Sequence, residues 1–318
     1  MIGVVGSGAF GTALAVALAK TGQNVRLWGR DAEAMARIGQ AREVFRLPGV
    51  ILPKNVSVTA EIAELVGAEA VLLAVPMQAL NGFLAEHGAA LDGSALVACA
   101  KGVDLTRLQG PTALMALHCP ASPTAVLTGP SFAADIARGL PTALTLASKD
   151  PAGARLQHLL STPVLRLYLS TDPIGAELGG ALKNVIAIAA GVVLGAGLGE
   201  SARAALVTRG YAEMLRLAVA LGARPETLAG LSGFGDLVLT CTSLQSRNLR
   251  FGSSLGGGPA FEAGQTVEGA ATAGAVSELA SRRGIDMPIA AMVAALVADK
   301  IPLEQAVQSL LTRPLKQE

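Results

Sequence analysis

Charged side chains are scarce in this sequence of 318 residues, where Asp, Glu, Lys and Arg together make up only 15%. Hydrophobic residues make up 51%, which excludes a disordered chain because so much apolar surface is available for burial. The formal net charge is +1, so no broad basic field favours nucleic acid or an anionic membrane as a partner. An anionic ligand therefore has to be held by a few local charges.

Cysteine and histidine are also rare, with three of each. The cysteines are Cys99, Cys119 and Cys241, and none of them forms a CxxC pair. This favours three reduced thiols over a disulfide or a metal site. The histidines are scattered and lack the spacing of zinc ligands, so we expect no metal.

A long uninterrupted hydrophobic run is missing as well. The uncharged stretch over residues 184–199 is interrupted by Gly191, Gly195 and Gly197 and is shorter than the ~20 residues that a membrane span needs. A buried core helix is the favoured interpretation. No signal peptide precedes the first apolar run at Ile2, so we expect a cytoplasmic protein without a membrane span.

The first half of the chain alternates short apolar runs with helical patterns. Such alternation predicts a doubly wound, mostly parallel sheet of the Rossmann type, with strands buried on both faces. The expected strands are 2–5, 24–28, 70–75, 95–99, 125–127, 143–147 and 164–169. The expected helices between them include 9–20, 32–40, 78–86 and 152–160.

After about residue 170 the strand-like runs disappear. The patterns there predict helices over 177–193, 202–221, 270–281 and 289–298. We therefore expect a dinucleotide-binding domain over residues 1–170 and an all-helical substrate-binding and catalytic domain over 171–318. The Asp172-Pro173 pair is the expected break between them.

A glycine-rich loop follows the first expected strand and has the pattern GxGxxG. Gly6 allows the tight turn, Gly8 lets the backbone approach a pyrophosphate, and Gly11 lets the helix pack close to the strand. The N-terminus of that helix offers unpaired N–H groups to the pyrophosphate. The loop therefore predicts a bound dinucleotide, and a glycine-rich turn without a ligand is the alternative.

The end of the second expected strand bears on which dinucleotide binds. NAD-specific folds commonly have an acid at this place, but here Gly29 stands there and Arg30 follows. A guanidinium suits a 2′-phosphate, so we expect NADP(H) to be preferred, with NAD(H) possible. In the rival interpretation Asp31 contacts the ribose, and otherwise Asp31 caps the next helix.

Two lysines are candidates for proton transfer. Lys183 is the only cation between Arg166 and Arg203, and small or apolar residues surround it, so burial would lower its pKa toward the working range. Lys101 follows a strand at the sheet edge where ligands collect in doubly wound folds. Taken alone, each could instead be an ordinary solvated lysine.

Further polar candidates occur in short glycine- or serine-containing segments. The Gly129–Ala133 segment follows a strand, Asp236 lies in an expected tight loop bounded by glycines, and Ser246-Arg247-Asn248 offers donors for a phosphate. Each segment could also be a surface turn, and Glu268 is a weaker candidate still.

The order and spacing of four segments resemble the bacterial NAD(P)-dependent glycerol-3-phosphate dehydrogenases. The segments are GPSFA at Gly129, ELGGALKN at Glu177, SGFGDL at Ser232 and SRN at Ser246. The resemblance extends from Ile2 to about Ala273. It implies hydride transfer between a nicotinamide and C2 of dihydroxyacetone phosphate or sn-glycerol 3-phosphate, with the product supplying phospholipid synthesis, and it favours a homodimer.

The resemblance also implies roles for single residues. Lys183 corresponds to the proton-transferring lysine, Lys101 to a lysine that contacts cofactor and substrate, and Asp236 to the acid that orients both. The implied substrate contacts are Lys101, Gly129, Ser131, Lys183, Asp236, Ser246, Arg247 and Asn248. The implied cofactor contacts, beside the loop glycines, are Ala9, Phe10, Arg30, Lys101, Gly129, Ala133, Arg247, Thr266 and Glu268. Ala9 departs from the serine usual in the family, which removes one side-chain hydrogen bond to the pyrophosphate.

Two other functions remain open at this level. A dehydrogenase of a 3-hydroxy acid or sugar acid could use the same architecture and the same Arg247. A non-catalytic NADP(H) sensor would bind the cofactor but would have no need of Lys183, Lys101 and Asp236.

Overall fold

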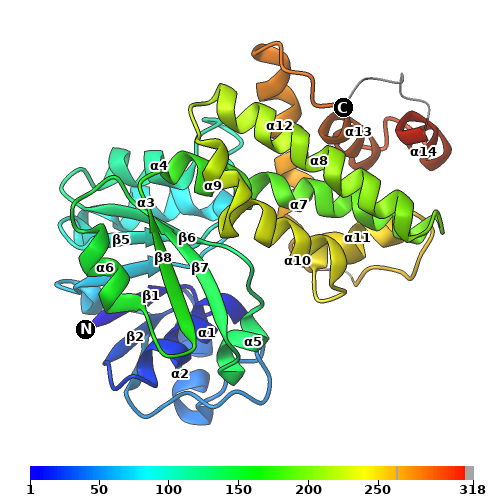
Figure 1. The fold of residues 1–318 in the computed structure, drawn as a ribbon. Coiled ribbons are helices and arrows are strands. Elements are labelled where there is room, and N and C mark those ends of the chain that lie inside the picture. The colour runs from blue at the N-terminus through cyan, green and yellow to red at the C-terminus, as the bar shows by residue number, and fades with distance from the viewer. Residues whose placement is uncertain (263, 312–318) are drawn as a thin grey trace.

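The structure is a computed structural model that describes residues 1–262 and 264–311. It has an α/β lobe and a second lobe whose described residues form helices but no strands (Figure 1). The predicted fold class, a Rossmann-type sheet domain followed by an all-helical one, is confirmed. The last strand ends at Ser170 and the first helix of the second lobe begins at Pro173, so the predicted domain boundary falls between them.

Within the described residues, the α/β lobe holds one eight-stranded sheet in the order β3-β2-β1-β4-β5-β6-β7-β8. Neighbouring strands are parallel except β6 and β7, which are antiparallel. The strands are β1 Ile2–Val5, β2 Val25–Trp28, β3 Val56–Thr59, β4 Ala70–Leu73, β5 Ala95–Ala98, β6 Thr124–Thr128, β7 Thr142–Ala147 and β8 Leu165–Ser170.

The central strands consist of apolar residues because both of their faces are covered. β1, β4 and β5 are buried at every position. The connections are helical, and several of these helices pack directly on the strands. They are α1 Ala9–Ala19, α2 Ala32–Ala41, the 3₁₀ turn η1 Ile62–Leu65, α3 Met77–Leu91, α4 Pro111–His118, α5 Ala133–Arg138 and α6 Gly153–Leu160.

The strand order reverses between β1 and β4, where the chain stops building one half of the sheet and starts the other. In open α/β sheets a crevice forms at the carboxyl ends of the strands at such a point, and ligands bind there. The glycine-rich loop leaves β1 at this edge, and α3 begins shortly after β4. The topology therefore places the expected dinucleotide site at this edge.

One strand, β3, was not among the predicted strands. Val56 and Thr59 are buried, but Ser57 is exposed and Val58 is only partly buried, because β3 lies at the edge of the sheet beside β2. The short half-polar sequence carries too weak a signal to stand out from a loop.

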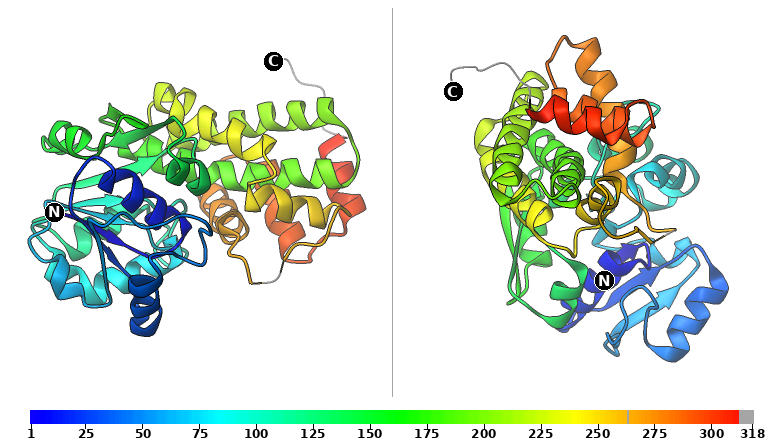
Figure 2. Two further views of the ribbon diagram at one scale, coloured as in Figure 1. Left: turned by 90° about the horizontal axis from the view of Figure 1, so that it is seen from below. Right: turned by 90° about the vertical axis from the view of Figure 1, so that its right-hand side faces the viewer.

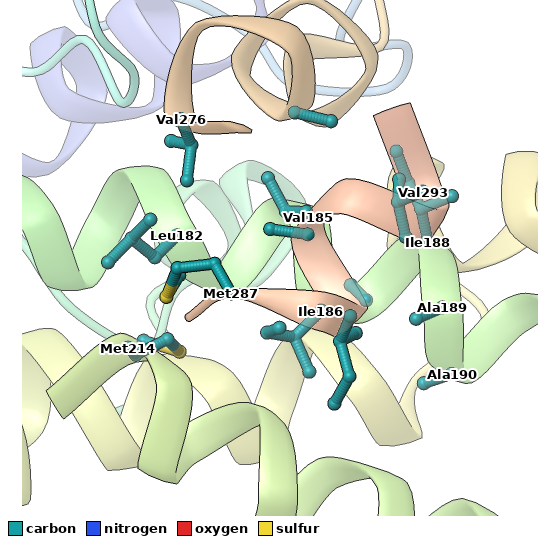
Figure 3. Close-up of a cluster of buried hydrophobic side chains, with 14 of the residues drawn as sticks. Leu182, Val185, Ile186, Ile188, Ala189, Ala190, Met214, Val276, Met287 and Val293 are labelled. Carbon is teal, nitrogen blue, oxygen red and sulfur yellow. The ribbon is translucent and has the colours of Figure 1, made fainter. Parts of the chain in front are cut away.

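The long helix α7 (Pro173–Gly195) runs through the middle of the second lobe (Figures 1 and 2). Leu182, Val185 and Ile186 of α7 pack in a core with Met214 and Met287, as the close-up in Figure 3 shows. The surrounding helices are α8 Glu200–Ala220, α9 Pro225–Ala229, the π-helical turn η2 Leu231–Gly235, α10 Asp236–Thr242, α11 Arg247–Leu255, α12 Glu268–Arg282, α13 Pro288–Val297 and α14 Leu303–Leu311.

Glycines let α7 and α11 touch backbone to backbone. A Cβ at Gly252 would lie 2.0 Å from the Ile188 carbonyl oxygen, and one at Gly191 would lie 2.2 Å from that of Leu249. No side chain fits at either position without a shift of one helix. These glycines fix the distance between the two helices.

Within the described residues, α7 is the one helix long and apolar enough to cross a membrane. In the fold, however, 89% of its most apolar window is buried inside the protein. α7 is therefore the core helix that its sequence favoured.

Several short helices differ from the sequence-based expectation. The sequence patterns did not predict α9, α10, α11 and α14. The prediction of a tight loop around Asp236 is wrong. Instead, η2 runs directly into α10, and Asp236 is the first residue of that helix. Three glycines or serines in Leu231–Gly235 suggest a loop, but Gly233 instead allows a close backbone approach, because a Cβ there would lie 2.0 Å from the Leu228 carbonyl oxygen.

Candidate active site

One buried carboxylate, Asp236, binds two lysines from different parts of the chain. The Lys183 ammonium donates to Asp236 Oδ1 at 2.8 Å, and the Lys101 ammonium donates to Asp236 Oδ2 at 2.6 Å. The Asp236 side chain is 1% exposed, and those of Lys183 and Lys101 are 8% and 14% exposed. The structure thus brings together the three residues predicted to be catalytic.

Each lysine has a second acceptor as well. Lys183 Nζ donates to Thr240 Oγ1 at 2.7 Å, and Lys101 Nζ donates to the Gly129 carbonyl oxygen at 3.2 Å. An ammonium has three N–H groups, so these contacts within the described residues leave each lysine one donor for a ligand. Two cationic donors beside one anion suit a ligand with several oxygens.

Small residues on α7 allow this arrangement. A Cβ at Gly180 would lie 2.8 Å from Thr128 Oγ1 and 3.4 Å from Lys101 Cγ, so a side chain there would push α7 off the sheet lobe. A Cβ at Gly179 would lie 2.4 Å from the Ser232 carbonyl oxygen. The two glycines of the ELGGALKN segment thus hold Lys183 close both to Lys101 and to the segment before Asp236.

The electrostatics of the cluster favour proton transfer by Lys183. Burial, the largest effect, and the Lys101 charge together lower the pKa of Lys183 to about 8, although Asp236 opposes both. Burial would by itself raise the pKa of Asp236, but the two lysines outweigh it and hold that pKa below its usual value. Near neutral pH, Asp236 is therefore ionised, and Lys183 can both give and take a proton.

The predicted phosphate-binding triplet lies at the start of α11. Ser246 caps this helix, because its Oγ accepts from the Leu249 N–H at 3.2 Å. Asn248 joins three helices: its Nδ2 donates to Asn184 Oδ1 at 2.9 Å, and its Oδ1 accepts from the Gly269 N–H at 3.0 Å. Arg247 is exposed at the first position of α11, where a helix N-terminus favours an anion.

The glycine-rich loop fits a dinucleotide pyrophosphate. Gly6 has φ +110°, and a Cβ at Gly11 would lie 2.1 Å from the Gly6 carbonyl oxygen, so neither position accepts a side chain. Around Gly8, by contrast, nothing lies within 4 Å of where a Cβ would be. A tight turn with open space above its second glycine is what close approach of a pyrophosphate requires.

The other predicted cofactor residues lie at the same sheet edge or close to the lysines. Gly129 has φ +140°, and its carbonyl oxygen accepts from Lys101 and from Ser131 Oγ at 3.3 Å. Ala133 begins α5 just after this turn. A cavity of about 80 Å³ contains Met77, Lys101, Thr266 and Glu268 in its lining. Burial raises the pKa of Glu268, whereas Arg247, Lys101 and Lys183 lower it.

Comparison with known proteins assigns this arrangement to a family. The chain matches the family models described as the N-terminus and the C-terminus of NAD-dependent glycerol-3-phosphate dehydrogenase, over residues 1–154 and 172–308. It is 65% identical to glycerol-3-phosphate dehydrogenase [NAD(P)+] of Cereibacter sphaeroides, with 100% of both chains covered. The enzyme of the same name from Paracoccus denitrificans is 63% identical, with 100% of this chain and 99% of that one covered.

The chain belongs to the NAD(P)-dependent glycerol-3-phosphate dehydrogenase family. The crystal structure of the glycerol-3-phosphate dehydrogenase from Coxiella burnetii matches it with a TM-score of 0.93 and 37% identity, covering 98% of each chain. A ketopantoate reductase from Ralstonia eutropha matches with a TM-score of 0.63 at 17% identity, which shows a shared fold alone. The predicted resemblance is thereby confirmed.

For a glycerol-3-phosphate dehydrogenase of this fold, the structure adds three residues to which sequence reasoning gave no role. Thr240 accepts from Lys183, Asn184 accepts from Asn248, and Glu177 accepts from the Thr112 N–H at 2.8 Å. Thr240 lies one helical turn after Asp236, and Asn184 directly follows Lys183. Helical spacing from the predicted residues would have found Thr240 if the α10 helix had been recognised.

Proposed function

We propose that this protein reduces dihydroxyacetone phosphate to sn-glycerol 3-phosphate, and catalyses the reverse oxidation, with NADPH preferred over NADH. Membership of the family supports the reaction. The observation that carries the proposal is the buried cluster in which Asp236 holds Lys183 and Lys101, each with one donor left for a ligand. A sensor that only binds a dinucleotide has no use for two partly desolvated cations.

Lys183 is the proposed acid and base. When bound at the β1 edge, the nicotinamide cofactor supplies or accepts a hydride at C2 of the substrate. The Lys183 ammonium donates its proton to the developing C2 oxygen, and in the oxidation direction the neutral amine takes that proton back. Lys101 and Asp236 keep a fixed positive field and a fixed orientation around that oxygen, so little reorganisation is needed.

The N-terminus of α11 is the proposed site for the substrate phosphate. Arg247 supplies a planar cation, and the first amides of α11 supply the positive end of a helix. The Asn248 side chain fixes this end of α11 to α7 and α12, and therefore fixes its distance from Lys183. Binding energy from the phosphate can in this way position the carbonyl for reaction.

The end of β2 supports the preference for NADP(H). Gly29 is buried, and a Cβ there would lie 2.5 Å from Met35 Sδ, so the position has no ready room for an acid. Asp31 does not replace that acid, because its Oδ1 accepts from the Ala34 N–H at 2.9 Å as the cap of α2. The exposed Arg30 is therefore the charged residue available at the end of β2, and its guanidinium suits a 2′-phosphate.

The decisive experiment is a panel of substrates and cofactors. We expect NADPH oxidation with dihydroxyacetone phosphate and none with 3-hydroxy acid or sugar-acid partners in their keto forms. Lys183→Ala should lower turnover about 100-fold or more, while the exposed Lys149→Ala should leave it unchanged. Equal rates with a keto acid, or a fully active Lys183→Ala variant, would refute the proposed function.

We further propose that the enzyme works in the cytoplasm as a homodimer and supplies glycerol 3-phosphate for phospholipid synthesis. The exposed apolar side chains Phe234, Val238 and Leu244 on and beside α10 support self-association. Light scattering on the purified protein tests the dimer. Growth of a deletion strain with and without added glycerol 3-phosphate tests the metabolic role.

A further inference from the structure

Ser7, the first variable residue of the glycine-rich loop, places a hydroxyl beside the end of β2. The Gly6 N–H donates to the Trp28 carbonyl oxygen at 2.9 Å, which joins the start of the loop to the last residue of β2. A Cβ at Gly29 would lie only 2.7 Å from Ser7 Oγ. The Ser7 hydroxyl therefore lies where a side chain at position 29 would otherwise be.

This hydroxyl has hydrogen-bonding capacity to spare. Ser7 is half-buried, and its Oγ makes no hydrogen bond to any residue that the structure describes. The Met35 thioether also lies close to the Cβ position of Gly29, at 2.5 Å, but Met35 is 2% exposed and its sulfur is only a weak acceptor. The Ser7 hydroxyl is therefore a donor and acceptor available to a ligand.

The charge next to this hydroxyl is positive. Arg30 directly follows Gly29 and is exposed, whereas the nearby Asp31 is committed to capping α2. A hydroxyl donor and a guanidinium together suit a group with several anionic oxygens, because one oxygen can accept from each. The 2′-hydroxyl of an unphosphorylated ribose carries no charge and therefore gains no charge attraction from Arg30.

We propose that Ser7 is a further cofactor-binding and specificity-determining residue, whose hydroxyl donates to the 2′-phosphate of NADP(H) alongside Arg30. The inference rests on the proposed NADP(H) preference and deepens it. Gly29 has a role in it, because a side chain at that position would collide with the Ser7 hydroxyl.

Binding to the full-length protein tests the inference without catalysis. Dissociation constants for NADPH, NADH, 2′,5′-ADP and 5′-AMP are measured by calorimetry for the wild type and Ser7→Ala. We expect about tenfold weaker binding of NADPH and 2′,5′-ADP, since a hydrogen bond to a charged group is lost, and less than twofold change for NADH and 5′-AMP. Ser201→Ala, an exposed serine on α8, should change none of the four.

Arg30→Ala separates failure of this inference from failure of the proposed cofactor preference. If Ser7→Ala weakens all four ligands equally, or none, while Arg30→Ala selectively weakens NADPH, the Ser7 assignment alone is overturned. If neither variant discriminates and the wild type binds NADPH and NADH equally, the proposed preference fails together with the inference.

Discussion

At the scale of single residues, Asp236 sets the chemistry of the site by holding two cations at fixed positions. Each of its two carboxylate oxygens accepts from one ammonium group, so Lys183 and Lys101 lie close together, although 135 residues separate Lys101 from Asp236 in the chain. One carboxylate between two ammonium groups leaves the cluster with a net positive charge. Such a cluster suits a phosphorylated substrate. Burial of the cluster, with a smaller effect of the Lys101 charge, lowers the pKa of Lys183.

The pH dependence of the two reaction directions should be opposite. Reduction needs the protonated Lys183, so its kcat/KM should fall as pH rises through about 8, the pKa of this lysine. Oxidation needs the neutral amine and should rise through the same range. Rate profiles at saturating cofactor measure both. Two profiles that rise together would exclude Lys183 as the shared acid and base.

Thr240→Val should shift these profiles to lower pH. The hydroxyl accepts from the Lys183 ammonium at 2.7 Å, and its loss removes a partner of the charged form. We expect the rate of reduction to fall about tenfold above pH 8, since one hydrogen bond to the charged form is lost. Thr242→Val is the matched control, because Thr242 is exposed on the same helix. A pH profile that does not shift would show that the Thr240 hydroxyl has no effect on the protonation of Lys183.

Arg247→Ala should chiefly raise the apparent KM for dihydroxyacetone phosphate. A charge-assisted contact to the phosphate accounts for roughly a tenfold to hundredfold increase. Steady-state kinetics measure this, with the exposed Arg209→Ala as a control for general charge effects. An unchanged KM would mean that the phosphate binds elsewhere.

At the scale of elements, glycine spacing controls how α11 meets α7. The sequence marked Gly191 as an interruption of an uncharged stretch, but its function is to admit the Leu249 carbonyl oxygen. Because α11 presents Arg247 and Asn248, the distance between these helices also sets the distance from the proposed phosphate site to Lys183.

Gly252→Ala should therefore destabilise the protein by about 1–3 kcal/mol, because a methyl group 2.0 Å from the Ile188 carbonyl oxygen forces the helices apart. Thermal unfolding measures the change. Gly274→Ala in α12 is the matched control, since that position is exposed, has nothing within 4 Å, and should gain roughly 0.5–1 kcal/mol from helix propensity. A lower Tm for Gly274→Ala than for Gly252→Ala would contradict this account.

Sequence patterns predicted the elements that carry strong periodic signals and missed those defined by packing. Buried strands such as β1 and β4, and the long helices α7 and α8, were predicted within a few residues. β3 was missed because an edge strand of four residues alternates in polarity, and α10 was missed because the glycines before Asp236 resemble a loop. For the site, sequence motifs suggested Lys183, Lys101 and Asp236. No sequence pattern indicated the hydrogen bond between Lys183 and Thr240, since that contact depends on how α10 faces α7.

At the scale of the whole molecule, Glu177 ties the two lobes together. It belongs to α7, yet its carboxylate accepts from the Thr112 N–H at the start of α4, and a Cβ at Gly110 would collide with it. Burial, the largest effect, raises the pKa of Glu177 to about 7 with a small contribution from the Asp172 charge, although the hydroxyl and amide of Thr112 oppose this rise. Glu177 is therefore a titrating group within the interface between the lobes.

Glu177→Gln should change how stability depends on pH. The Glu177 carboxyl holds its proton more tightly in the folded protein than in the unfolded chain, so its contribution to stability is full below about pH 4.5 and is lost as pH rises through about 7. Gln stays neutral, so the Tm of the variant minus that of the wild type should increase from pH 5 to pH 8. The exposed Glu226→Gln should show a constant difference. A constant difference for Glu177→Gln as well would remove this group from the pH response.

The wide separation of Lys101, Lys183 and Asp236 along the chain has a consequence for biosynthesis. A nascent chain that has only completed β1 to β8 already contains the glycine-rich loop, but it lacks both Lys183 and Asp236. Translation must extend past α10 before the two ammonium groups can share their carboxylate. On the proposed mechanism, a ribosome-bound fragment that ends before α10 has the glycine-rich loop but lacks the groups for proton transfer, so activity has to wait until much of the second lobe has been made.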